Sequence, residues 1–184
     1  MAYFNSTIPV ANLQAPQGAR PAQYLYDEED QLYAAYKARL DVARVLGQAQ
    51  KYFDGIHYLN ISSECFLKYA FCLVRHEIRQ INPPKDILHE KAPYDFDTTF
   101  LFPKNKLTTQ YFGHDLNLVV RFLIKFSDAY NFPEFKSYIL HLKSGEKWIN
   151  TRYIAGVHAT FQQDFNDYLR DFDAVLNGCF RGIQ

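Results

Sequence analysis

The chain of 184 residues is long enough for one folded domain, and its content of 48% hydrophobic and 17% aromatic residues excludes global disorder. Twenty basic residues balance twenty acidic ones, which excludes the strongly basic composition of proteins that wrap duplex DNA. Any contact with nucleic acid must therefore come from a local patch or from a site assembled between subunits.

The first 26 residues carry three prolines and a glycine and show no helical or strand periodicity. Such a composition is typical of irregular chain ends. We therefore predict a flexible N-terminal arm over residues 1–26 and a folded domain over residues 27–184. Within this domain the first helix is predicted from Asp27, whose side chain can cap a helix N-terminus, to Gly47.

A second helix is predicted over residues 50–80, where apolar residues recur at helical spacing. Its apolar and small residues are Phe53, Ile56, Leu59, Ser63, Phe66, Leu67, Ala70, Leu73 and Val74. So broad a surface predicts a central helix that its neighbours contact on several sides. Pro83 and Pro84 end this helix, and the acids, prolines and aromatics of residues 83–113 predict an insertion packed on the side of the helices.

A third helix is predicted to begin at Asp115, and a shorter one covers residues 134–142. The clearest helical pattern is the last, over residues 159–180. Its apolar stripe is Phe161, Phe165, Tyr168, Leu169, Phe172, Val175, Leu176 and Cys179, and its polar face carries Asp164, Asp167, Arg170 and Asp171. No strand-like alternation is long enough to build a sheet, so we predict an all-α fold, an antiparallel up-and-down bundle of four to five helices.

The three cysteines are an odd number without a Cys-x-x-Cys pair, which favours buried thiols in a reducing compartment. The first 15 residues do not have the pattern of a signal peptide, and the longest apolar stretch, residues 69–74, is too short to span a bilayer. We expect a cytoplasmic protein without membrane contact. Because no phosphate-binding glycine loop and no metal-ligand spacing occurs, we expect neither a cofactor nor a metal.

Three motifs follow one another along the chain. The second helix carries Glu64 and, four residues on, Lys68; Gly-His-Asp-Leu, with His114, opens the third helix; Arg152-Tyr153 precedes the last. In this order the motifs resemble the HEPN family (higher eukaryotes and prokaryotes nucleotide-binding) over about residues 30–180. The resemblance implies a helical homodimer that binds RNA or nucleotides. The chain departs from many relatives in its long segment between the second and third helices.

HEPN domains include metal-independent ribonucleases whose signature is an arginine, four to six residues, and a histidine. Arg152 and His158 match it with five residues between them. The resemblance implies that His158 transfers protons, since a histidine pKa lies near neutrality, and that Arg152 clamps the phosphate. Lys147 and Tyr153 would position the substrate. The alternative interpretation is structural, with Arg152 binding helix carbonyls and His158 in the first helical turn.

Glu64, Lys68 and His114 are further candidates for substrate binding, although Glu64 and Lys68 also have the spacing of an ordering ion pair along one helix face. Two functions therefore stay open. One is a metal-independent endoribonuclease of a toxin–antitoxin or defence system. The other is a non-catalytic helical interaction module that pairs with itself or with a nucleotidyltransferase-like partner. If the protein is the ribonuclease, a nucleotidyltransferase-like protein would be its antitoxin partner.

Overall fold

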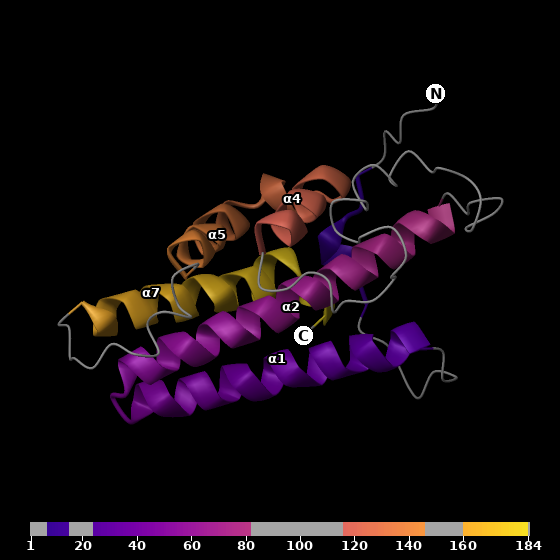
Figure 1. Cartoon of the computed structure of the whole chain (residues 1–184). Helices are drawn as coiled ribbons and strands as arrows, with labels where there is room; N and C mark the ends of the chain where they lie inside the picture. Colours follow the sequence, from indigo (N-terminus) through magenta and orange to yellow (C-terminus); the bar gives the residue numbers. More distant parts are fainter. Residues whose placement is uncertain (1–6, 15–23, 82–115, 146–159, 184) are drawn as a thin grey trace.

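The computed structural model describes residues 7–14, 24–81, 116–145 and 160–183, and the fold consists of helices (Figure 1). The main helices are α1 (Tyr24–Gln48), α2 (Tyr52–Ile81), α4 (Leu116–Phe126), α5 (Pro133–Gly145) and α7 (Phe161–Ala174). Shorter turns are η1 (Val10–Asn12), η3 (Ala129–Asn131), the π-helical η4 (Val175–Cys179) and η5 (Arg181–Ile183). The predicted all-α class is confirmed. No helix within these residues is long and apolar enough to cross a membrane.

Helix α2 occupies the centre of the molecule. Figure 1 shows α1 along one side of it, α7 beside it, and α4 and α5 on the side opposite α1. No residue between Ile56 and Glu77 is exposed. The fully buried ring of Phe66 has its centroid 5.6 Å from Tyr36 of α1 and 5.4 Å from Phe172 of α7. The prediction of a central helix with neighbours on several sides is confirmed.

The helices around α2 differ in direction. A tight turn at Gln50, whose φ is 58°, reverses the chain, so α1 and α2 are antiparallel. Helix α7 instead runs in the same direction as α2, because Phe161 lies on Phe53 and, further along both helices, Phe172 lies on Phe66. Up-and-down order therefore holds between neighbours such as α1 and α2, but not between α2 and α7.

Residues 7–14 pack into the core, although the whole stretch 1–26 was expected to be a flexible arm. Ile8, Val10 and Leu13 are at most 3% exposed. The N–H of Ile8 donates to the carbonyl of Phe126, and the N–H of Val10 donates to the Asp128 carboxylate at 2.8 Å. Buried apolar side chains and two backbone hydrogen bonds thus anchor η1 and the residues before it against the end of α4.

The N-terminal segment 7–14 and the C-terminal turn η5 meet near α1. A Cβ on Gly182 would lie 2.0 Å from the carbonyl oxygen of Leu13, so η5 is in direct contact with the N-terminal segment. The hydroxyl of Tyr36 donates to the carbonyl of Ile183 at 2.8 Å. Helix α1 begins at Tyr24, three residues before the predicted Asp27. The predicted insertion at residues 83–113 lies outside the described parts of the chain.

Two glycines fix the position at which α7 starts. A Cβ on Gly47, at the end of α1, would lie 2.4 Å from the Phe165 ring, and one on Gly55, at the start of α2, would lie 2.6 Å from it. Phe165 is 2% exposed. Its ring therefore fills the space that the two missing side chains leave, and it holds the first turns of α7 against the α1–α2 turn.

We predict that Gly55→Ala lowers the free energy of unfolding by about 1–3 kcal/mol, because the added methyl group collides with a ring that cannot move in a packed core. Chemical denaturation followed by circular dichroism measures this change. Gly178→Ala is the matched control, since its Cβ would meet Glu134 at an ordinary 3.6 Å. That control should be neutral or stabilising by up to about 1 kcal/mol. Equal stability of the Gly55→Ala variant and the unmodified protein would contradict this packing.

Candidate functional site

Several of the residues that the sequence selects fall outside the described parts of the chain. These are His114, Lys147, Arg152, Tyr153 and His158. Their neighbourhood in the sequence is nevertheless informative, because His158 stands three residues before Phe161, the first residue of α7. In the sequence, His158 and Arg152 thus stand three and nine residues before the helix that Phe165 anchors.

Glu64 and Lys68, the two other predicted site residues, form an ion pair on α2. The Lys68 ammonium lies 2.6 Å from the Glu64 carboxylate, and the two side chains are only 13% and 14% exposed. The pKa of the Cys65 thiol is raised, mainly by burial and secondly by the adjacent Glu64 carboxylate. The charges of Lys68 and Arg39 act in the opposite sense. The geometry favours the ordering interpretation of this pair, since each charge already has a partner within the helix.

Asp171, which the sequence pattern assigns to the polar face of the last helix, connects three polar side chains in the described part of the chain. Its carboxylate accepts hydrogen bonds from Ser137 at 2.5 Å, from His141 Nε2 at 3.0 Å and from Arg170 Nε at 3.0 Å. Ser137 and His141 lie one turn apart on α5, so Asp171 joins α5 to α7. The residue is 7% exposed, which corrects the expectation of an outward polar face at this position.

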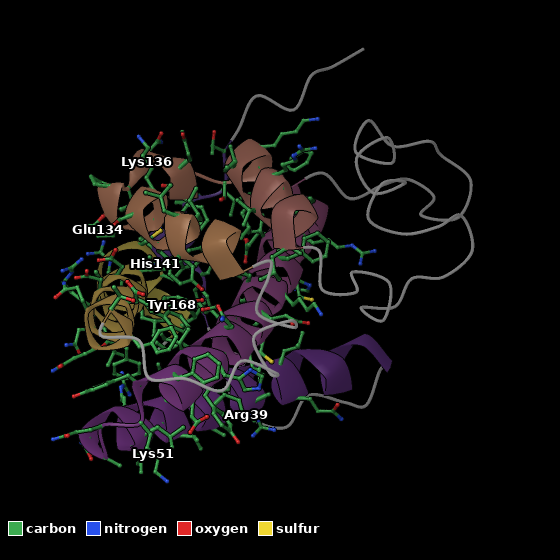
Figure 2. All side chains as sticks on the ribbon, turned by 60° about the vertical axis from the view of Figure 1, so that its left-hand side comes forward. Arg39, Lys51, Glu134, Lys136, His141 and Tyr168 are labelled. Atoms are coloured by element: carbon green, nitrogen blue, oxygen red, sulfur yellow. The ribbon has the colours of Figure 1, made fainter. Side chains whose placement is uncertain are left out.

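A stack of aromatic rings continues from this cluster into the core. Figure 2 shows His141 and Tyr168 next to each other, and their rings are parallel within 9° with centroids 4.9 Å apart. The Tyr168 hydroxyl donates to Ser63 of α2 at 2.9 Å. Burial raises the pKa of Tyr168, so this phenol stays protonated at neutral pH. Three helices are therefore linked through His141 and Tyr168.

The chemistry of the Asp171 cluster is that of a brace between helices. In a Ser-His-Asp catalytic triad the serine hydroxyl binds the histidine, which removes its proton. Here the hydroxyl of Ser137 and the imidazole of His141 both bind the same oxygen of Asp171. Burial alone would raise the pKa of Asp171, but the hydrogen bonds from Ser137, His141 and Arg170 outweigh it, and the pKa is lowered. The carboxylate is thus stabilised as an anion.

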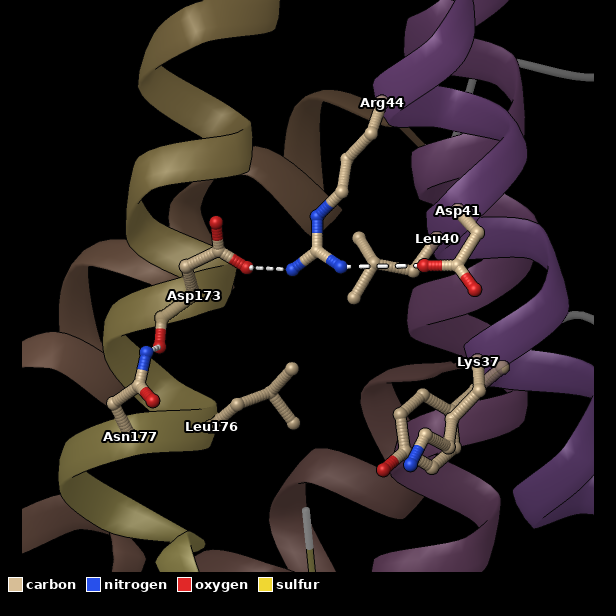
Figure 3. A pocket seen from close by; sticks show the side chains of 8 residues that line it. Lys37, Leu40, Asp41, Arg44, Asp173, Leu176 and Asn177 are labelled. Carbon is tan, nitrogen blue, oxygen red and sulfur yellow. Dashed lines mark hydrogen bonds and ion pairs between the residues drawn. The ribbon is translucent and has the colours of Figure 1, made fainter.

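A groove between α1 and the C-terminal end of α7 has a volume of about 190 Å³ (Figure 3). Leu40 and Leu176 form its apolar wall. Across it, Arg44 binds Asp41 at 3.3 Å and Asp173 at 2.8 Å, so its guanidinium is occupied within the chain. Pockets for drug-sized ligands are usually larger, about 300–1,000 Å³. The groove is therefore better explained as a contact between α1 and α7 than as a ligand site.

Metal-ligating side chains do not gather within the described residues: no group of three or more histidines, cysteines or carboxylates there has the arrangement of a metal site. The cysteines are free thiols, two of them half-buried and Cys179 buried. The pKa of Cys179 is raised, mainly by burial and secondly by the negative charges of Asp128 and Glu134. A protonated thiol is a poor nucleophile, so Cys179 is a packing residue.

We predict that Asp171→Asn lowers the free energy of unfolding by about 1.5–3 kcal/mol at pH 7, because three donors lose a charged acceptor. Since the folded protein lowers the pKa of Asp171 below its ordinary 3.8, this contribution is complete well above pH 3.8. It is lost as the pH falls through the lowered pKa. The difference in stability between variant and unmodified protein should therefore shrink below about pH 4, as urea titrations at several pH values would measure.

Asp167→Asn is the matched control for this experiment. Asp167 also binds Arg170, but its side chain is 29% exposed, so its loss should cost about 0–1 kcal/mol. Equal losses in the two variants at pH 7, or a difference that does not depend on pH, would contradict the role of Asp171 as a buried anionic brace.

The chain was compared with protein families, curated proteins and solved structures. The chain matches no protein-family model, no curated protein and no solved structure.

Proposed function

We propose that this protein is an RNA-binding, metal-independent endoribonuclease of HEPN type, and that Arg152 and His158 carry the reaction. The observation that supports this proposal best is the anchoring of α7. His158 stands three residues and Arg152 nine residues before Phe161 in the sequence, and Phe165, one turn into the helix, is held between Gly47 and Gly55. A catalytic pair gains most from a rigid element beside it, because small displacements of reacting groups reduce the rate strongly.

In the proposed reaction His158 removes the proton of the ribose 2′-hydroxyl. The 2′-oxygen then forms a bond to phosphorus while the bond to the 5′-oxygen breaks, and that oxygen takes a proton from water, while the protonated His158 returns its proton to the solvent. The products are a 2′,3′-cyclic phosphate and a 5′-hydroxyl. Arg152 binds the phosphate oxygens on which charge gathers. Lys147, Tyr153 and His114 would contact the substrate, while the Glu64–Lys68 ion pair orders α2.

We predict that His158→Ala lowers the rate of RNA cleavage by about 10²- to 10⁴-fold, because the reaction loses its proton-transfer group. Arg152→Ala should also strongly reduce cleavage. The assay is labelled RNA incubated with purified protein in EDTA, scored by gel and mass spectrometry for fragments that end in a cyclic phosphate.

His76→Ala is the control for this assay, since His76 lies near the far end of α2, away from the start of α7. It should cleave as well as the unmodified protein. An unmodified protein that never cleaves RNA would refute the proposal, as would a His158→Ala variant with full activity.

We further propose that the active form is a homodimer, in which two copies of the Arg152–His158 segment share one cleft. The broad apolar surface of α2 is covered within one chain and is not available for pairing. The outer face of α1 does expose Val42 and Val45, which are 37% and 62% exposed. These residues lie one turn apart, so they favour a helix-to-helix contact between two α1 helices.

Light scattering coupled to gel filtration should give twice the chain mass of 21.5 kDa at tens of micromolar protein. The double variant Val42→Glu and Val45→Glu should give the mass of one chain, because two carboxylates would face each other across the contact. Replacing Leu140, which is 63% exposed on α5, by Glu is the control and should leave the dimer intact. A monomer mass for the unmodified protein contradicts the proposed pairing.

One observation favours a second candidate, a non-catalytic interaction module. Asp171 and the Glu64–Lys68 pair find their polar partners within the chain. Such a module would bind a second copy of itself or a nucleotidyltransferase-like partner. The cleavage assay separates the two functions, because a module without catalysis leaves RNA intact.

A further inference from the structure

The described residues 116–142 carry an asymmetric distribution of charge. Three charged side chains of this stretch are exposed, and all three are cations: Arg121 and Lys125 on α4 and Lys136 on α5. Figure 1 shows α4 and α5 together on the side of the molecule opposite α1. In a chain without net charge, the exposed charges of this described stretch are thus all positive.

The two carboxylates of the same stretch are partly buried. Asp128 accepts the N–H of Val10 at 2.8 Å. Glu134 is half-buried, one of its oxygens is fully covered, and its side chain lies beside Gly178. Both acids are therefore only partly exposed, whereas the three cations are exposed. In the described part of this layer the cations dominate the field that an approaching anion meets.

An exposed aromatic ring lies at the junction of the two helices. Tyr130 in η3 is 45% exposed, and the Lys136 ammonium lies 4.7 Å from the centre of its ring. An aromatic ring next to a cation can contact a base and the adjacent phosphate together. Such a combination is typical of surfaces that bind single-stranded nucleic acid without sequence preference.

We infer that Arg121, Lys125, Tyr130 and Lys136 form a docking surface for single-stranded RNA, here called the basic face. The three cations contact backbone phosphates, and Tyr130 stacks on a base. The inference takes its ligand class from the proposed function but does not depend on cleavage. It adds the place where RNA binds. The four residues of the basic face precede Lys147 and Arg152 in the sequence.

A membrane surface is the competing partner for a basic face, and the packing of these helices argues against it. A helix that lies on a membrane inserts a broad apolar face into the lipid. The apolar faces of α4 and α5 are buried in the core instead, with Phe122, Leu123 and Phe135 at most 4% exposed. Among the described residues of α4 and α5, the exposed large aliphatic side chains are single ones, Ile124 at 37% and Leu140 at 63%.

The test measures binding and cleavage separately. Fluorescence anisotropy with a labelled uridine 15-mer uses the full chain carrying His158→Ala, so that the RNA stays intact. In this background we compare Arg121→Gln with Lys136→Gln as a double variant, and Tyr130→Ala as a single variant. The control, Lys37→Gln with Arg39→Gln, removes two exposed cations of α1. Thermal unfolding by circular dichroism verifies that each variant is folded.

We expect the double variant to reduce the slope of log K against log salt by about 1.4, since each phosphate contact contributes about 0.7 on a single strand. At 0.1 M salt this corresponds to a roughly 25-fold weaker affinity. Tyr130→Ala should weaken binding about fivefold or more through lost stacking, with little change in the salt slope. The α1 control should bind within about twofold of the background protein.

Three outcomes would overturn the inference: no binding of RNA by the background protein, equal losses in the α1 control, or binding to phosphatidylserine vesicles in place of RNA. The two proposals fail in different ways. Binding through the basic face without cleavage by the unmodified protein refutes the ribonuclease alone. Cleavage that depends on His158 but is unchanged in the Arg121 and Lys136 variants refutes the basic face alone.

Discussion

The burial of Phe66 is the constraint around which the other helices are arranged. Its ring is fully covered and contacts aromatic rings of α1, α5, α7 and the C-terminal segment, the last through Phe180 at 5.2 Å. Burying one phenylalanine contributes about 1.5–3 kcal/mol, and each well-placed ring pair adds about 0.5–1.5 kcal/mol. Because these partners come from four segments, the packing of one side chain on α2 favours the assembly of the whole domain.

A helix covered on every side must also satisfy its polar groups within the chain. The hydroxyl of Ser62 donates a hydrogen bond to the carbonyl of Tyr36 at 2.7 Å, and the hydroxyl oxygen of Ser63 accepts one from the hydroxyl of Tyr168. The small serine side chains allow α1 and α7 to approach α2 closely. The same requirement explains why Asp171 collects three donors, since a buried carboxylate without partners would be costly. Chemistry on a substrate is therefore expected at the ends and outer surfaces of the helices.

The sequence predicts the local features well, because periodicity and spacing record which faces of a helix are buried. The apolar breadth of residues 53–74 indicates the central helix, and the spacing of Glu64 and Lys68 indicates their ion pair. Contacts between distant segments leave no such pattern. Ile8 and Val10 form too short a stretch to show periodicity, and the Asp128 that binds Val10 is 118 residues away. Likewise, Asp171 looks like a surface residue until α5 provides Ser137 and His141.

The net charge of zero does not mean that charge is spread evenly over the described surface. The exposed part of α7 is rich in carboxylates, with Asp164 and Asp167 on its outer side, and Arg44 and Arg170 are bound to carboxylates. The cations of the α4–α5 layer share their surface with no exposed acid among the described residues. In the proposed complex, an RNA strand is therefore attracted to the α4–α5 layer, while carboxylates of α7 such as Asp167 and Asp173 are paired with arginines. An uneven electric field orients a polyanion before any specific contact forms. A uniformly basic protein of the same size attracts the polyanion equally from all sides and does not orient it.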